Sequence, residues 1–308
     1  MSRPTRVIID TDAGIDDALA LALAAFSPEL ELTAVTTSYG NATLTQTTRN
    51  ARHVLQLAQR SDVRVHPGAA RPLRRPFTPP TTHGPAGSGF AHVPPEPSQC
   101  RPNPHVLAQV LDHATAPVVL VTLGPLTNLA NALSTSEEVV RRKLSSHVAV
   151  LGASTAGADF NAWVDPEAAH RVVQSGLPTR AIGLDVSRLV LLEAGTVEGL
   201  AASHLPLVQW LAQALRFSVE SHRSRFGVDG CYPHDALAIA SLLRSDLVDF
   251  EPKSIRVELD EGDERGHTTE TETGSPIHMA TRIDVERSHR LLGRVLGTAW
   301  LSKQRKHI

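Results

Sequence analysis

The sequence has few cysteines, almost no net charge and no long apolar run near its start, and each shortage excludes a class of protein. Two cysteines in 308 residues are too few for a disulfide framework, so we expect a reducing, cytoplasmic location. A formal net charge of −2 and 15 scattered histidines argue against nucleic acid as a partner. The apolar run that follows the basic N-terminal residues, Val7–Ile9, is too short for a signal peptide or a membrane span.

The chain contains enough apolar residues, 41% of the total, to fill a large core. Short apolar runs alternate with helical patterns, and the predicted strands are residues 7–9, 32–38, 63–66, 117–123, 148–152 and 179–184. This alternation predicts a mostly parallel central sheet flanked by helices, with ligands beyond the carboxyl ends of the strands. We therefore expect one large α/β domain of Rossmann-like type over residues 1–308.

Three segments complete this prediction. Residues 68–104 hold 10 of the 21 prolines and predict a long irregular loop. Residues 254–259 and 267–273 have the pattern of a polar hairpin, and residues 284–301 that of a terminal helix.

Four carboxylates crowd into the turn after the first predicted strand, in the run Asp10-Thr-Asp12-Ala-Gly-Ile-Asp16-Asp17. Burying like charges without partners costs several kcal/mol, so a bound cation is the economical explanation. Gly14 permits a tight turn there. The helix that follows is expected to begin with Asp16 or Asp17 as its N-cap.

Two other acidic motifs can be compared with this run. An EF-hand beginning at Asp10 is excluded, because its fifth, sixth and twelfth positions hold Gly14, Ile15 and Leu21 instead of an oxygen ligand, glycine and glutamate. A phosphotransferase of the haloacid dehalogenase type also places Asp-x-Asp after a strand. That alternative stays open, with Asp10 as nucleophile and Asp12 as acid/base beside Mg²⁺.

The acidic run resembles the Asp-x-Asp-x-Gly-x-Asp-Asp signature of the inosine-uridine preferring nucleoside hydrolases, which are calcium-dependent N-ribohydrolases. Further segments resemble that family in the same order along the chain, and they are Gly40-Asn41, His83-Gly84, Gly124-Pro-Leu-Thr-Asn128, Asp159-Phe-Asn161, Asp165-Pro-Glu-Ala-Ala169 and His234-Asp235-Ala-Leu-Ala238. The resemblance therefore covers most of the first 235 residues, and it implies the α/β fold of the nucleoside hydrolases.

The resemblance implies a Ca²⁺ site and a general base. The metal ligands that it implies are Asp12, Asp17, Asp235 and the backbone carbonyl of Leu123. Such an all-oxygen set, with room for water and sugar hydroxyls, suits Ca²⁺ better than Mg²⁺. Asp12 would also act as the general base.

The remaining site residues are likewise implied by resemblance. Asp16, Asn41 and Asn161 would hold the 2′ and 3′ hydroxyls of the sugar. His234, together with His83, would help the base to leave. Asp159 stands where the family has a glutamate that reaches the 5′ hydroxyl.

Two departures from the family's pattern concern the 5′ end of the sugar. Asp159 is one methylene shorter than the expected glutamate, and Ala153 stands at the spacing of an asparagine that the family has upstream. Recognition of the 5′ group is therefore expected to differ from that of the family.

The sequence thus predicts calcium-dependent hydrolysis of the N-glycosidic bond of ribonucleosides, giving free base and ribose. Its partner would be a small nucleoside rather than nucleic acid or membrane, and the resemblance implies a homo-oligomer, either a dimer or a tetramer. Besides the phosphotransferase, a calcium-stabilised nucleoside-binding protein without turnover stays open as an alternative.

Overall fold

The computed structural model describes residues 3–96, 100–153 and 157–297, and nine strands of this part form one sheet. Across the sheet the order is β10-β9-β11-β6-β5-β4-β1-β2-β3. The strands are β1 (Thr5–Thr11), β2 (Leu30–Thr37), β3 (Arg64–Pro67), β4 (Val118–Thr122), β5 (Leu144–Val150), β6 (Thr179–Ile182), β9 (Val248–Val257), β10 (Thr268–Thr271) and β11 (Ile277–Ile283). A separate pair joins β7 (Leu192–Glu193) to β8 (Gly230–Cys231).

The neighbouring strands from β3 to β11 are all parallel, whereas β9 is antiparallel to β11 and to β10. The chain builds β1, β2 and β3 outward in one direction and then returns to place β4 on the other side of β1. The strand order therefore reverses between β1 and β4. In open α/β sheets such a reversal leaves a crevice at the carboxyl ends, where ligands bind.

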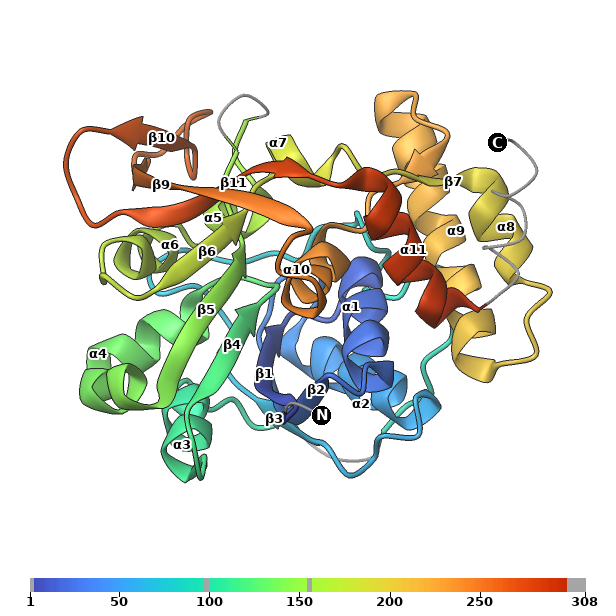
Figure 1. The fold of residues 1–308 in the computed structure, drawn as a ribbon, viewed down its shortest axis with the longest axis horizontal. Coiled ribbons are helices and arrows are strands. Elements are labelled where there is room, and N and C mark those ends of the chain that lie inside the picture. The colour runs from blue at the N-terminus through green and yellow to red at the C-terminus, as the bar shows by residue number, and fades with distance from the viewer. Residues whose placement is uncertain (1–2, 97–99, 154–156, 298–308) are drawn as a thin grey trace.

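Helices cover both faces of the sheet (Figure 1). One face carries α1 (Ile15–Phe26), α2 (Leu44–Leu57), α9 (Pro206–Phe226), α10 (His234–Leu243) and α11 (Val285–Leu296), and the other carries α3 (Val106–His113), α4 (Thr127–Lys143) and α6 (Pro166–Val173). The short helices are α5 (Phe160–Val164), α7 (Leu184–Ser187) and α8 (Ala194–Leu200). Because both faces are covered, β4 is buried along its whole length and is apolar up to its last residue, Thr122.

The structure confirms the predicted α/β architecture with a mostly parallel sheet. The polar hairpin is also confirmed, as β9 and β10. Strand β11 was not predicted, because its burial alternates irregularly and its sequence, Ile-His-Met-Ala-Thr-Arg-Ile, shows no clear period. The terminal helix ends at Leu296, and residues 298–301 of its predicted span lie outside the described part.

Between β3 and α3, the described residues 68–96 and 100–105 form no helix or strand. No helix in the described part of the chain is long and apolar enough to cross a membrane.

Candidate active site

Three carboxylates meet at the carboxyl edge of the sheet. One oxygen from each of Asp16, Asp17 and Asp235 lies within 4.8 Å of the other two. Asp16 and Asp17 belong to the first turn of α1, and Asp235 belongs to the first turn of α10. The alanine- and leucine-rich helices α1 and α10 pack against each other, and this contact brings their two acidic N-termini together (Figure 1).

The start of α1 differs from the prediction. Its N-cap is Gly14 rather than Asp16 or Asp17, and Asp17 is the third helical residue. The Asp17 carboxylate accepts hydrogen bonds from the Gly14 backbone N–H (2.8 Å) and from the Thr11 hydroxyl. The expected N-cap was therefore wrong, because a carboxylate at the third position can satisfy the same backbone donor by reaching back to it.

The turn that leads into α1 stores backbone strain. Ala13 has a φ of 39°, a left-handed conformation that costs a non-glycine residue about 1–2 kcal/mol. Its backbone N–H donates to the Thr11 hydroxyl (3.0 Å), and its carbonyl accepts from Asn50 Nδ2 (3.2 Å). These two bonds hold the turn in the shape that presents the acids.

Asp12 is buried beside this group, between two glycines. Its Oδ2 accepts a hydrogen bond from the backbone N–H of Asn41 (2.7 Å). A Cβ added to Gly40 would lie 2.0 Å from that oxygen, and one added to Gly124 would lie 2.8 Å from Oδ1. Glycine is thus required on both sides of the carboxylate, at the ends of β2 and β4.

The carboxylates raise one another's pKa. Burial raises the pKa of Asp12, Asp16 and Asp235, and the charges of neighbouring acids raise each of them further; the value for Asp16 is about 7. Among the described residues, no lysine or arginine forms an ion pair with Asp12, Asp16 or Asp235. A hard divalent cation with oxygen ligands fits this set, because it supplies the missing positive charge.

Asp10, near the end of β1, is a further buried carboxylate. One of its oxygens accepts from the Thr36 hydroxyl and from Asn128 Nδ2 (2.8 Å), whereas Oδ2 is buried without a partner among the described residues. Burial is the main reason why the pKa of Asp10 is raised to about 7. No role was predicted for Asn128, although it lies in a segment of recognisable pattern.

At the ends of β4 and β5, Asn161 bridges two backbone carbonyls. Its Nδ2 donates to the carbonyl of Leu123 (2.7 Å) and to that of Val150 (3.0 Å). With the amide nitrogen used in this way, Oδ1 is the atom of Asn161 that can accept from a hydroxyl. The Leu123 carbonyl, expected as a metal ligand, keeps a second lone pair.

Asn41 and Asp159 are both tied to their surroundings. Asn41 Nδ2 donates to Asp17 Oδ2 (3.2 Å). Asp159 is the N-cap of α5, where Oδ1 accepts from Ala162 N–H (3.1 Å) and Oδ2 from Gly152 N–H (2.7 Å). Burial raises the pKa of Asp159 to about 6, although these bonds oppose the shift. Both oxygens of Asp159 thus have structural partners, which the sequence did not indicate.

His83 enters the site from the irregular segment. Its Nδ1 accepts a hydrogen bond from the backbone N–H of Ile15 (2.9 Å), so Nε2 carries the proton of the neutral ring. Burial lowers the pKa of His83 to about 4, and its Nδ1 lies 3.9 Å from Asp16 Oδ1. A Cβ at Gly14 would lie 2.7 Å from the same nitrogen. The neutral ring can therefore donate a hydrogen bond through Nε2.

His234 lies at the start of α10, next to Asp235. Its Nδ1 is 2.7 Å from the Ser187 hydroxyl, and its ring lies 5.6 Å from that of Tyr232. Burial, and then the charge of Arg188, lowers the pKa of His234 to about 3. No pattern in the sequence indicated Ser187, which lies 47 positions upstream in the chain.

The structure therefore brings most of the predicted residues to one edge of the sheet. Asp16, which was expected to contact the sugar, belongs to the three-carboxylate group with Asp17 and Asp235, and Asp12 lies beside that group.

Comparison with known proteins gives a consistent result. A sequence model of the family described as inosine-uridine preferring nucleoside hydrolase matches residues 7–290. The pyrimidine-specific ribonucleoside hydrolase RihA of Photobacterium profundum is 38% identical over 300 residues, covering 93% of this chain and 96% of that protein. Among solved structures, the purine-preferring ribonucleoside hydrolase of Gardnerella vaginalis matches with a TM-score of 0.87 and 28% identity, over 96% of this chain and 100% of that one. A plant nucleoside hydrolase matches with a TM-score of 0.86 and 29% identity, over 95% and 99%.

Proposed function

The chain belongs to the inosine-uridine preferring nucleoside hydrolase family, and from this membership we propose how its own residues perform the reaction. The protein is an N-glycosyl hydrolase that cleaves ribonucleosides to free base and ribose. The family match over residues 7–290 favours this activity over the phosphotransferase, which accounted for the first acidic run alone.

We propose that Asp12, Asp17, Asp235 and the Leu123 carbonyl hold a calcium ion, with Asp16 close enough to join them. The observation that carries this proposal is the group of three carboxylates within 4.8 Å, without a lysine or arginine partner in the described part of the chain. When bound, the ion offsets the repulsion among the acids and acidifies a water at the site.

Asp12 acts as the general base in this proposal. Its Oδ2 is fixed by Asn41 N–H, so the carboxylate is oriented without a side-chain partner that would compete for the proton. Asn41, held by Asp17 after the end of β2, and the free acceptor atom of Asn161, held at the ends of β4 and β5, bind the 2′ and 3′ hydroxyls. N-glycosidic cleavage passes through an oxocarbenium-like state, which the buried carboxylates stabilise electrostatically.

His83 and His234 serve the leaving base as neutral donors. Both have a lowered pKa, about 4 and about 3, so neither ring is cationic at neutral pH. His83 donates through Nε2, and His234 does the same when Ser187 donates to its Nδ1. A hydrogen bond to the base nitrogen on which charge develops stabilises the departing anion.

The test is a panel of purine and pyrimidine ribonucleosides assayed with and without a chelator. We expect turnover that is lost on chelation and restored by Ca²⁺, together with about one equivalent of calcium in the purified protein. Both base classes are needed, because the relatives include a pyrimidine-specific and a purine-preferring enzyme. Asp17→Ala should lose the metal, because the carboxylate supplies ligands and its removal leaves the other acids repelling one another.

Three outcomes would contradict parts of the proposal. Active protein without any divalent metal in elemental analysis would exclude the calcium site. Nucleoside binding without turnover would support the non-catalytic alternative. Cleavage of a phenyl phosphate in place of nucleosides would support the phosphotransferase.

We also propose a homo-oligomer and a cytoplasmic location, the latter because both cysteines are free.

A further inference from the structure

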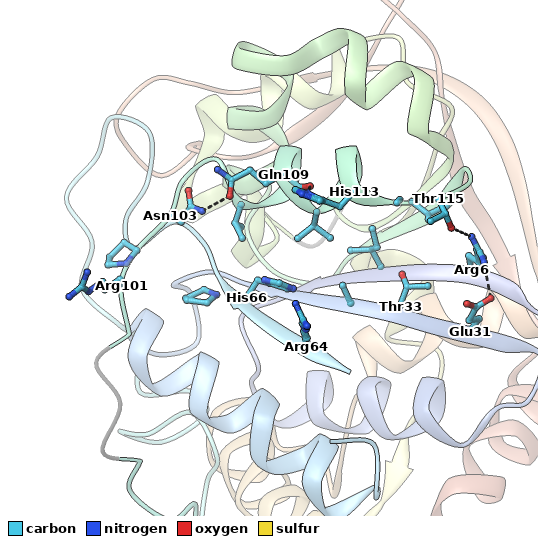
Figure 2. Close-up of a pocket in the computed structure, with 18 residues that line it drawn as sticks. Arg6, Glu31, Thr33, Arg64, His66, Arg101, Asn103, Gln109, His113 and Thr115 are labelled. Carbon is cyan, nitrogen blue, oxygen red and sulfur yellow. Dashed lines mark hydrogen bonds and ion pairs between the residues drawn. The ribbon is translucent and has the colours of Figure 1, made fainter. Parts of the chain in front are cut away.

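A groove of about 730 Å³ lies away from the acidic site, between α3 and the outer strands of the sheet (Figure 2). At one end are Arg6 and Glu31, near the beginnings of β1 and β2, and at the other end is Arg101. The acidic site occupies the carboxyl ends of the strands, whereas this groove begins at their amino ends. It is therefore a separate feature, and none of the proposed catalytic or metal-binding residues lines it.

The groove exists because α3 is short and its neighbours on the sheet are small. Helix α3 has eight residues, and its buried side packs over Ile8 and Val118. Farther out, Ala34 of β2 pairs with Arg64 of β3 and offers only a methyl group to this face. Ile8, Ala34 and Val118 are themselves buried, and the apolar part of the lining that is at least partly exposed consists of Pro67, Pro102, Val110 and Ala114.

The walls of the groove carry an excess of positive charge. Arg64 and His66 alternate on β3 and so share the face that lines the groove. Glu31 is the one acid among the described lining residues, and it is already bound by Arg6 (3.1 Å). Arg64 and Arg101 form no ion pair with any described residue, so within this part of the chain their charges are not balanced by an acid.

Polar groups on the helix side add hydrogen-bonding capacity. Gln109 and His113 of α3 lie across the groove from His66 (Figure 2). His113 Nδ1 is 2.6 Å from the Gln109 carbonyl and so donates to it, which leaves Nε2 for a ligand. Burial, and then the charges of Arg64 and Arg52, lowers the pKa of His66, so its ring is neutral and can donate as well as accept.

We propose that this groove binds a small organic anion that carries a phosphate or carboxylate group on an apolar ring. Arg64 and Arg101, which have no ion-pair partner among the described residues, supply the positive charge for the anionic group, and the partly exposed apolar lining of Pro67, Pro102 and Val110 receives the ring. The volume lies within the range of about 300–1,000 Å³ that is usual for small-molecule sites. Arginine suits this task because its planar donors match the oxygens of both anionic groups.

Three probes with the same ring separate the parts of this proposal: 2-naphthyl phosphate, 2-naphthoate and neutral 2-naphthol. Binding to the full-length, calcium-loaded protein is measured by equilibrium dialysis. At least one of the anions should bind at one site per chain, and the naphthol should bind at least about tenfold more weakly. The stronger of the two anions identifies the preferred group. Saturating uridine or inosine should leave this binding unchanged, because the active site is elsewhere.

Variants then place the probe in the groove. Arg64→Gln and Arg101→Gln should each weaken anion binding by about three- to tenfold, whereas Arg64→Lys should retain part of it. Arg74→Gln is the matched control, because Arg74 is exposed and lies outside the groove. Thermal unfolding and nucleoside turnover should be the same in all four variants and the wild type.

Several results would overturn the proposal. Equal binding of naphthol and the anions would reduce the groove to an apolar patch. Loss of the probe on adding uridine would place it in the active site. If no anion binds and Arg64→Glu instead separates an oligomer into monomers by sedimentation, the groove is an interface between copies of this chain.

Discussion

Asp165 and Asp235 are both buried carboxylates at the start of a helix, but their neighbours act on them in opposite ways. Four donors surround the carboxylate of Asp165, and they are the hydroxyls of Thr127 and Tyr39 and the backbone N–H groups of Leu73 and Ala168. Burial raises the pKa of Asp165, while hydrogen bonds from three of these donors oppose it. For Asp235 burial is again the largest cause, but Asp16, Asp17 and Asp12 all raise the pKa further.

This contrast separates a structural carboxylate, Asp165, from one that we propose to be functional, Asp235. Asp165 is a single charge with enough donors, so it joins the start of α6 to α4, to the segment after β2 and to the irregular segment without any further ligand. At the acidic site the charges outnumber the groups that could balance them. Such an arrangement is stable only when something else supplies positive charge, which is why the site rather than Asp165 is where we place the ion.

The largest expected effect is that of Asp12→Asn. It removes the proposed base while keeping the size of the side chain, so turnover should fall by at least about a thousandfold, or about 4 kcal/mol of barrier. The metal-free protein should not be destabilised, because the change removes a charge that Asp16 and Asp17 repel. Single-turnover kinetics at saturating nucleoside provide the measurement. A loss of less than about tenfold, or about 1.4 kcal/mol, would exclude Asp12 as the base.

A pair of isosteric changes tests the contrast directly. Asp165→Asn should destabilise the protein by about 2–4 kcal/mol, because an amide nitrogen would face donors that need an acceptor. Its calcium content should be unchanged. Asp235→Asn should lower the calcium content and stabilise the metal-free protein, since it removes a proposed metal ligand and also a charge that three neighbours repel. Denaturant unfolding of the metal-free proteins, with elemental analysis, distinguishes the two; equal destabilisation by both changes would contradict our comparison.

Much of this arrangement could be predicted from the sequence, because it depends on local patterns. Residues 7–25 identify a strand, an acidic turn and a helix by themselves, and the alternation of elements indicates the parallel sheet. What could not be predicted depends on contacts between distant segments. Asp165 is plainly a helix cap in the sequence, but its bond to Tyr39 joins residues 126 positions apart.

The acidic site shows the same limit. The sequence could supply the four acids of the turn, but not which of them face Asp235, because this depends on how α1 packs against α10. The predicted N-cap of α1 was wrong for a related reason. Asp17 accepts from the Gly14 backbone N–H although it is the third helical residue. The sequence alone does not show whether an aspartate near a helix start is the N-cap or the third helical residue.

His234→Ala tests the neutral donors that border the acids. The loss should be about a hundredfold for inosine, about 2.7 kcal/mol, because the departing base loses a hydrogen bond to developing charge. A nitrophenyl riboside, whose leaving group needs no such help, should be affected far less. Steady-state kinetics on both substrates give the comparison. Equal losses on the two would show that His234 only holds Ser187 or the start of α10 in place.

The smallest effect concerns Asp159, which shares features with the structural carboxylate Asp165 and with the carboxylates of the acidic site. It lies at the edge of the site, but like Asp165 it caps a helix, with Oδ1 bound to Ala162 N–H and Oδ2 to Gly152 N–H. The neighbouring backbone is fixed as well, because Ala153 exchanges two hydrogen bonds with the Thr268 hydroxyl.

A side chain committed to the backbone in this way should bind the 5′ hydroxyl of the sugar weakly. A 5′-deoxy nucleoside should therefore be cleaved with a kcat/KM within about tenfold of its parent, since a net hydrogen bond is worth about 1 kcal/mol. Asp159→Ala should cost about 1 kcal/mol of stability through the lost cap, yet leave that ratio unchanged. If the wild type instead rejects the 5′-deoxy analogue by about a hundredfold or more, which corresponds to at least about 2.7 kcal/mol, and Asp159→Ala abolishes the discrimination, then Asp159 contacts the substrate and belongs with the functional carboxylates rather than with Asp165.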